Sequence, residues 1–208
     1  REIFNFQFSI LNYFVSLHQN TTMLELHNVT IKPLIDSLSL TVGDGQLVCL
    51  TGSERVGKTT LLRAILGFIP IDSGHISIDG ELLTPLSAPY FRRQIAYVPQ
   101  RLTAIEDYDS IADLSEMLFG LKVNKGETSY KVPIDGRRWA ELSADERYLL
   151  LLQNAMQLDK RLLIVDEPGL PISAETMETV DRLLQEAADR GATVFAVNSR
   201  ILQNQIRL

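Results

Sequence analysis

The sequence predicts an α/β domain in which helices flank a mostly parallel sheet, with an antiparallel β region on its N-terminal side. Short apolar strands alternate with helical segments in the second half of the chain, which is the pattern of a parallel sheet covered on both faces. The first half instead has closely spaced strands separated by glycine turns. The chain has 208 residues, 45% hydrophobic and 22% charged, which suits one globular domain.

The antiparallel region is predicted from segments that alternate between apolar and polar residues or run apolar over a few positions. Turns such as Gly43-Asp44-Gly45 separate these segments. In this half, strands are expected at residues 24–29, 38–42, 46–51, 75–78 and 95–98. A helix is expected at residues 58–66, where apolar residues recur at helical spacing before Gly67 ends it.

The parallel sheet is predicted from the β-α-β alternation of the second half. An apolar helix at residues 146–158 precedes a strand at 162–165. A second helix at about 176–190 ends at Gly191 and precedes a strand at 193–197. Strands that alternate with helices in this way are joined by crossovers and therefore lie parallel.

The chain divides into an N-terminal extension and one domain. Residues 1–22 lack the basic segment and the cleavage site of a signal peptide. We expect them to form a disordered or non-native extension, with an amphipathic helix as the alternative. Residues 23–208 are expected to form the domain. Polar, helix-like segments begin at residue 101, so a small helical subdomain is expected at about 101–158 within it.

Composition and charge exclude several classes of protein. Lys and Arg number 20 against 26 Asp and Glu, which gives a net charge of −6 and disfavours a general nucleic-acid binder. A single cysteine, Cys49, cannot form an internal disulfide. No apolar run approaches the roughly 20 residues of a membrane span. We expect a cytoplasmic protein that binds no nucleic acid and acts at a membrane only through a partner.

The strongest local motif is a glycine-containing loop between a predicted strand and a predicted helix. Residues 52–59 read G-S-E-R-V-G-K-T, which satisfies the phosphate-loop pattern G-x-x-x-x-G-K-[ST]. The residues expected to bind nucleotide are Gly52, Ser53, Glu54, Arg55, Val56, Gly57, Lys58, Thr59 and Thr60. Lys58 is expected to reach the β- and γ-phosphates, and the Thr59 hydroxyl is expected to ligate Mg²⁺. The pattern indicates a P-loop NTPase that binds ATP.

An acidic pair ends the aliphatic strand at residues 162–165. Asp166 is expected to hold Mg²⁺ through water, and Glu167 to polarise the attacking water as general base. Taken alone, a strand that ends in Asp-Glu-Pro is more often a capped turn. Placed 108 residues after Lys58 in an α/β pattern, it is the expected partner of a phosphate loop.

The order of these motifs resembles the ATP-binding subunit of an ATP-binding cassette (ABC) transporter, over about residues 24–200. Besides the loop and the acidic pair, residues 72–80 resemble the family's "dSG.I..dG" segment, residues 91–100 its Q-loop, and Leu142-Ser143 the start of its signature motif. The resemblance implies that Gln100 contacts the metal and the attacking water. It also implies a transmembrane permease, a second ATP-binding subunit, and a peripheral place on the inner face of the cell membrane.

The sequence departs from the family pattern at several positions. Asp145 and Glu146 stand where the family's signature, which clamps the γ-phosphate across a head-to-tail dimer, has glycine and glutamine. The other departures are Arg55 for a loop glycine, Ser173 for an aspartate after the acidic pair, Ser199 for the switch histidine, and no aromatic residue at 30–33 to stack on adenine. His18, His27 and His75 are expected to be surface or strand residues instead. These changes leave one half of the site intact and weaken the half that the chain offers to a partner.

Three functions follow from these residues. The first is the ATP-hydrolysing subunit of an ABC transporter, and its alternative is a hydrolysis-impaired ABC-type regulatory subunit. Either one can form a homodimer or pair with a different, conventional subunit. The third, an ABC-type ATPase acting on DNA, is disfavoured because only 42 positions separate Gln100 from Leu142, too few for the long coiled coils of that class.

Overall fold

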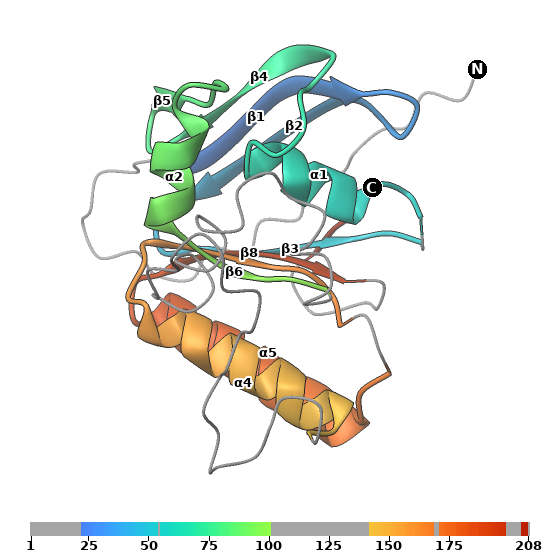
Figure 1. Ribbon diagram of the computed structural model, residues 1–208, viewed down its shortest axis with the longest axis vertical. Coiled ribbons are helices and arrows are strands. Elements are labelled where there is room, and N and C mark those ends of the chain that lie inside the picture. The colour runs from blue at the N-terminus through green and yellow to red at the C-terminus, as the bar shows by residue number, and fades with distance from the viewer. Residues whose placement is uncertain (1–21, 54, 101–141, 169–170, 199–204, 208) are drawn as a thin grey trace, which may run out of the picture.

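The computed structural model describes residues 22–53, 55–100, 142–168, 171–198 and 205–207. The described helices are α1 (Lys58–Ile65), α2 (Ala88–Gln94), α4 (Ala144–Gln157) and α5 (Ala174–Asp189). Figure 1 shows an antiparallel sheet at one end, α1 and α2 between it and a parallel sheet, and α4 and α5 on the far face of the parallel sheet. This arrangement confirms the predicted fold class. The predictions for residues 1–21 and 101–141 fall outside the described residues.

The antiparallel sheet has the strand order β2-β1-β4-β5. Its strands are β1 (Thr22–Ile31), β2 (Ile35–Gly43), β4 (Ser73–Ile78) and β5 (Glu81–Leu82). The inner face carries buried aliphatic residues such as Leu24 and Leu26, and the outer face carries more exposed residues such as Glu25 and His27. This alternation is what a sheet with one buried and one solvated face requires.

The parallel sheet has the strand order β6-β7-β8-β3-β9. Its strands are β3 (Leu47–Thr51), β6 (Ile95–Val98), β7 (Leu162–Val165), β8 (Thr193–Asn198) and β9 (Gln205–Arg207). All four neighbouring pairs are parallel, so the carboxyl ends of the strands lie at one edge. We call this edge the carboxyl edge. Every residue of β6, β7 and β8 is buried, because helices cover both faces of the sheet.

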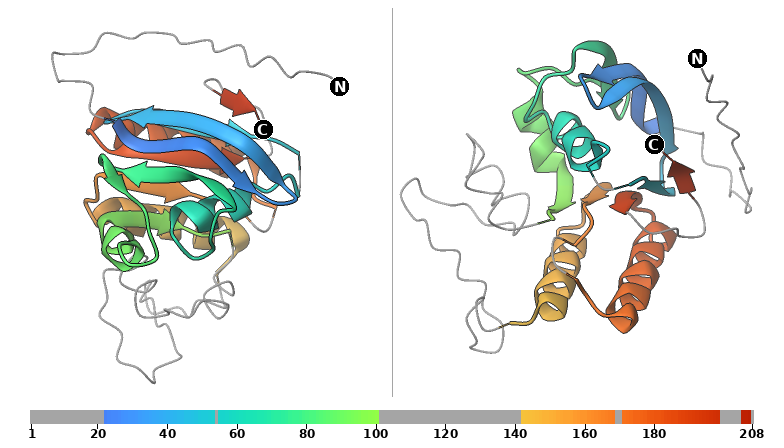
Figure 2. Two further views of the ribbon diagram at one scale, coloured as in Figure 1. Left: turned by 90° about the horizontal axis from the view of Figure 1, so that it is seen from above. Right: turned by 90° about the vertical axis from the view of Figure 1, so that its right-hand side faces the viewer.

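The helices cover the sheet with their apolar sides. Leu61, Leu62 and Ile65 of α1 are completely buried. Beneath the sheet, α4 and α5 run side by side, as the right-hand view of Figure 2 shows. α1, α4 and α5 begin at the carboxyl edge, because α1 and α5 follow strands of this sheet and α4 runs back to enter β7. Three helix N-termini therefore face the same edge.

Sequence periodicity located most of these elements to within a few residues. The strands at 95–98 and 162–165 have the predicted bounds, whereas α4 and α5 each begin two residues earlier than predicted. The pattern missed α2, β5 and β9. α2 is only seven residues long and contains Pro89, so it offers less than two turns of helical periodicity.

Candidate functional site

A glycine-containing loop joins the carboxyl end of β3 to the start of α1. Gly57, the last residue of this loop, has a φ of +105°, which glycine adopts without steric cost. A Cβ at Gly57 would lie 3.0 Å from the Cβ of Leu34 and 3.3 Å from Cγ1 of Ile35. Among the described residues, no side chain caps the start of α1. Its first amides are therefore open to an anion.

Arg55 lies in the same loop with a left-handed backbone, at a φ of +62°. This conformation costs a residue with a Cβ about 1 kcal/mol relative to glycine. The Arg55 side chain is exposed. The loop thus holds an arginine at the cost of backbone strain where the family commonly has glycine. Glu54, also predicted to bind nucleotide, lies outside the described residues.

Lys58 is the first residue of α1 and is only 4% exposed. Its ammonium donates hydrogen bonds to the carbonyl oxygens of Gly52, at 2.8 Å, and Ser53, at 2.9 Å. The Nζ atom also lies 3.7 Å from Oε1 of Glu167. An ammonium has three donors. Two of them hold Lys58 to its own loop, and the third is left for Glu167 or for a phosphate oxygen that takes its place.

The acidic pair follows β7 at the carboxyl edge. The main-chain N–H of Asp166 donates to the carbonyl of Val98 at 2.8 Å, so pairing with β6 extends one residue past the strand. Oδ1 of Asp166 accepts hydrogen bonds from the Thr59 hydroxyl at 3.3 Å and from the N–H of Glu167 at 3.0 Å. Because Thr59 belongs to α1, this contact joins the acidic pair to the phosphate loop across the intervening strand β8.

Each carboxylate of the acidic pair has one buried oxygen without a hydrogen-bond partner among the described residues. Asp166 is fully buried, and within the part of the chain that the structure describes neither its Oδ2 nor Oε2 of Glu167 has a hydrogen-bond partner. Burial raises the pKa of Asp166 to about 6, against the hydrogen bond from Thr59, which lowers it. Burying a carboxylate is costly, and for Asp166 the charge of Arg63 offsets only part of this cost, because the pKa is still raised. Carboxylate and hydroxyl oxygens are ligands that Mg²⁺ prefers, so Thr59 and Asp166 fit a magnesium ion.

Tyr148 on α4 is a supporting residue that the sequence analysis missed. Its side chain is buried, and its hydroxyl donates to the carbonyl oxygen of Asp166 at 2.6 Å. Burial raises the pKa of this phenol, which keeps it protonated as a donor. The contact fixes α4 against the acidic pair. A tyrosine within an apolar helix looks like an ordinary core residue, so the sequence carries no signal for this bond.

The other predicted site residues lie near the same edge. Gln100 follows β6 by two positions and is half-buried, and β6 is the neighbour of β7 in the sheet. Val56 and Thr60 are half-buried in the loop and in α1. The structure therefore brings Gln100 to the carboxyl edge that carries Asp166. Its contacts with a metal and a water stay a prediction.

The start of α4, which resembles the signature motif, is closed by its own side chains. The Ser143 hydroxyl accepts a hydrogen bond from the N–H of Glu146 at 3.1 Å. The Glu146 carboxylate in turn accepts from the N–H of Ser143 at 2.9 Å. This reciprocal pair is a capping box, which satisfies two of the amides that an uncapped helix start would offer to a ligand.

Two departures from the family pattern contact each other. Oδ1 of Asp145 accepts hydrogen bonds from the N–H of Ser173 at 2.8 Å and from its hydroxyl at 2.7 Å. The Ser173 hydroxyl also caps α5 by accepting from the N–H of Thr176 at 3.1 Å. Hydrogen bonds from Thr176 and Ser173 lower the pKa of Asp145 to about 2, so this side chain is charged at neutral pH. A further departure, Ser199, falls outside the described residues.

The sequence pattern that defines the ABC transporter family matches residues 35–169, which is more than half of the chain. The chain belongs to the ABC transporter family. The resemblance drawn from the sequence is thereby confirmed. The chain is an ATP-binding subunit of this family, whose ATP-binding domains bind nucleotide and are in general ATPases.

Known proteins support this assignment. The manganese transport system ATP-binding protein MntB of Listeria monocytogenes is 27% identical, over 84% of this chain and 79% of the relative. The taurine import ATP-binding protein TauB of Pseudomonas syringae pv. tomato is 29% identical, over 81% of this chain and 67% of the relative. These relatives are subunits of transport systems, which does not favour the alternative of a regulatory subunit.

The solved structures agree on the fold. The ADP conformation of MJ1267, an ATP-binding cassette of an ABC transporter, matches with a TM-score of 0.66 at 16% identity, over 87% of this chain and 82% of that one. At this identity the likeness shows the fold alone. None of the helices in the described ranges has the length and hydrophobicity that crossing a bilayer requires.

Proposed function

We propose that the chain hydrolyses Mg²⁺-ATP and thereby drives solute movement by a membrane permease. One observation carries the proposal. The phosphate loop and the acidic pair, which lie far apart in the sequence, meet at the carboxyl edge, where Thr59 lies 3.3 Å from Asp166 and Lys58 lies 3.7 Å from Glu167. Phosphoryl transfer needs a phosphate cradle, a metal ligand and a group that orients water, and these residues provide all three.

Nucleotide binding uses the open start of α1. The amides of residues 52–60 surround the phosphates at the positive end of the helix dipole. The Lys58 ammonium exchanges its weak contact with Glu167 for a phosphate oxygen and keeps its bonds to Gly52 and Ser53. This exchange releases the Glu167 carboxylate toward the γ-phosphate. Thr59 and Asp166, with Gln100, are the residues that would hold the magnesium ion.

The chemical step uses Glu167 as the general base. Its carboxylate is 15% exposed and stands beside the lysine that binds the phosphates, so it can accept the proton of a water aligned with the γ-phosphate. Lys58 stabilises the charge that develops on the phosphate oxygens. Mg²⁺, when bound, supplies further neutralisation of that charge. Tyr148 and Val98 fix the backbone of Asp166, which keeps the acidic pair in register with the loop.

Partners complete the function. We assign a transmembrane permease, which carries the chain on the inner face of the membrane, and a second ATP-binding subunit. The start of α4 supports a different chain as this second subunit, because its capping box and the Asp145 carboxylate disfavour an incoming phosphate. The two relatives are named for manganese and for taurine, so we assign solute choice to the permease and, by analogy with the taurine relative, import as the direction.

The test is phosphate release by the complex purified from native membranes. Glu167→Gln is expected to lower turnover by at least about a hundredfold while ATP binding is retained, because the amide cannot accept the proton. Glu178→Gln, an exposed carboxylate on α5, is the matched control and is expected to leave turnover unchanged.

Two results would count against the proposal. If Glu167→Gln releases phosphate as fast as the wild type, Glu167 is not the general base. A complete wild-type complex that binds ATP without releasing phosphate would leave an ATP-binding subunit and no ATPase.

A further inference from the structure

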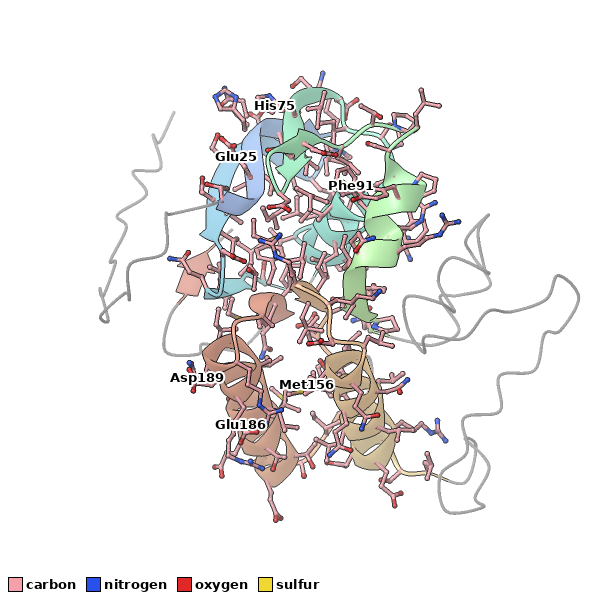
Figure 3. All side chains as sticks on the ribbon, turned by 90° about the vertical axis from the view of Figure 1, so that its left-hand side faces the viewer. Glu25, His75, Phe91, Met156, Glu186 and Asp189 are labelled. Carbon is pink, nitrogen blue, oxygen red and sulfur yellow. The ribbon has the colours of Figure 1, made fainter. Side chains whose placement is uncertain are left out.

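Two of the chain's three histidines form a pair on the outer face of the antiparallel sheet. His27 on β1 and His75 on β4 are direct cross-strand partners, and both are exposed. Their rings are stacked, with centroids 4.9 Å apart and planes inclined by 19°. Among the described residues, neither imidazole has a hydrogen-bond partner. Figure 3 shows His75 and Glu25 on the solvent side of this sheet, away from α4 and α5.

The backbone fixes this pair. Gly74, immediately before His75, has a φ of +84°, and a Cβ there would lie 2.4 Å from the carbonyl oxygen of His27 and 2.3 Å from that of Asn28. Only glycine lets β4 approach β1 this closely. Asn28 is held in turn by Ser39, whose hydroxyl accepts from the Asn28 N–H at 2.9 Å. The close approach of the two strands at Gly74 therefore holds His27 and His75 opposite each other.

We infer that His27 and His75 bind a divalent transition-metal ion that prefers imidazole, such as Zn²⁺, Ni²⁺ or Cu²⁺. Metal–nitrogen bonds of about 2.0–2.1 Å place two nitrogens on one tetrahedral ion about 3.4 Å apart. Rings stacked at 4.9 Å reach that separation by small side-chain rotations, which exposed histidines make readily. The site lies on the outer face of β1 and β4 and takes no residue from the nucleotide site.

The surroundings suit a partly hydrated ion. Within the described ranges, no group of three or more His, Cys, Asp or Glu side chains gathers to hold a metal ion. A metal bound by the two histidines would therefore take its other ligands from water. Glu25 lies on the same face of β1, two residues before His27, and pairs with Ser77 on β4. The Ser77 hydroxyl donates a hydrogen bond to the Glu25 carboxylate at 3.4 Å. This carboxylate adds negative charge beside the pair and can accept a hydrogen bond from a ligating imidazole or a bound water.

The inference is tested on the full chain without nucleotide, by calorimetric titration with Zn²⁺ and by electron paramagnetic resonance with Cu²⁺. The wild type is expected to bind one ion per chain, with two imidazole nitrogens on copper. His27→Thr and His75→Thr are each expected to weaken binding by at least about tenfold and to leave one imidazole nitrogen. Threonine suits a strand and has no ligating nitrogen.

Two variants serve as controls. His18→Thr removes the third histidine and is expected to bind as the wild type does. Glu25→Gln is expected to weaken binding less than loss of either ligand. Absence of saturable binding would overturn the inference. Equal metal affinity in the wild type, in His27→Thr and in His75→Thr would also overturn the inference, because the metal would then be an adventitious ion only. Circular dichroism checks that each variant is folded.

Discussion

The starts of α1 and α4 lie at the same edge of the parallel sheet and are built in opposite ways. α1 has no side-chain cap within the described residues, and Lys58 and the acidic pair stand around it with bonding capacity left over. α4 begins with a complete capping box, and Asp145 is bonded to Ser173 at the start of α5. One helix start is open to a ligand, and the other is closed by its own chain.

This difference shows that two helix starts at one edge of a sheet can have different roles, one in binding a ligand and the other in stabilising the fold. An uncapped helix start is less stable alone but offers amides to an anion. A capped start gains about 1 kcal/mol of stability and offers less to a ligand. The departures at Asp145 and Ser173 are consistent with this division, because they contact each other. The two regions are thus expected to respond differently to substitution.

The largest effect is expected at the open start. Lys58→Ala removes a charged hydrogen-bond donor to phosphate, worth about 1.5–3 kcal/mol, so ATP affinity should fall about tenfold to a hundredfold. Calorimetric titration with ATP measures the change. Lys160→Ala, outside the site, is the matched control. Equal ATP affinity in Lys58→Ala and Lys160→Ala would show that this lysine does not contact the phosphates.

The second prediction concerns Asp166, beside the open start of α1, where removing a charge is expected to stabilise the fold. Since the folded pKa of Asp166 is raised from 3.8 to about 6, the folded state binds more protons between these values, and stability falls as pH rises through them. Asp166→Asn keeps the hydrogen-bond acceptor for Thr59 and removes the charge. It should raise the free energy of unfolding at pH 7 by about 2–3 kcal/mol in the nucleotide-free chain, given the shift from 3.8 to about 6.

Urea unfolding at pH 7 and pH 4 measures this effect, which should shrink at the lower pH. Hydrolysis by the same variant should be lost, because an amide is a poor ligand for Mg²⁺. If Asp166→Asn were less stable than the wild type at both pH values, burial would not be the cause of the raised pKa of Asp166.

A smaller effect concerns the strained loop. Arg55→Gly relieves a left-handed conformation worth about 1 kcal/mol, and the greater freedom of glycine in the unfolded chain takes back part of it. We expect a net gain of about 0.5 kcal/mol in urea unfolding. Arg55→Ala keeps the Cβ and is the control, with no such gain expected. Equal stability of the two variants would mean that the loop is unstrained at this position.

The smallest effect is expected at the closed start. The pKa of Asp145 is lowered from 3.8 to about 2. Its hydrogen bonds therefore stabilise the fold fully at pH values above 3.8, and this stabilisation is lost as the pH falls toward 2. Asp145→Asn should lower the thermal midpoint by at most about 1 °C at pH 6 and by less near pH 2. A pH-independent difference between variant and wild type would show that the charge has no part in the contact.

The open region was largely predictable from the sequence. The phosphate loop needs glycine for its positive φ, a lysine and a hydroxyl residue at fixed spacing, and a strand before it, and all of these are local features. The acidic pair was found for the same reason, because it directly follows an aliphatic strand. The closed region was only half predictable. Its departures were visible one by one, but the bond between Asp145 and Ser173 spans 28 positions and leaves no pattern.

By itself, the sequence determined the alternation of strands and helices, the class of the domain and the residues predicted to surround a phosphate, because each depends on periodicity or on a motif read within a few residues. Only the tertiary structure decided which of these residues meet. The strand order sets β8 between the loop and the acidic pair, yet the fold brings Thr59 to the carboxylate of Asp166. It also brings the Tyr148 hydroxyl to the main-chain carbonyl of Asp166 and pairs His27 with His75. Strand order and register arise from packing across the whole core, and no local segment of the chain encodes them.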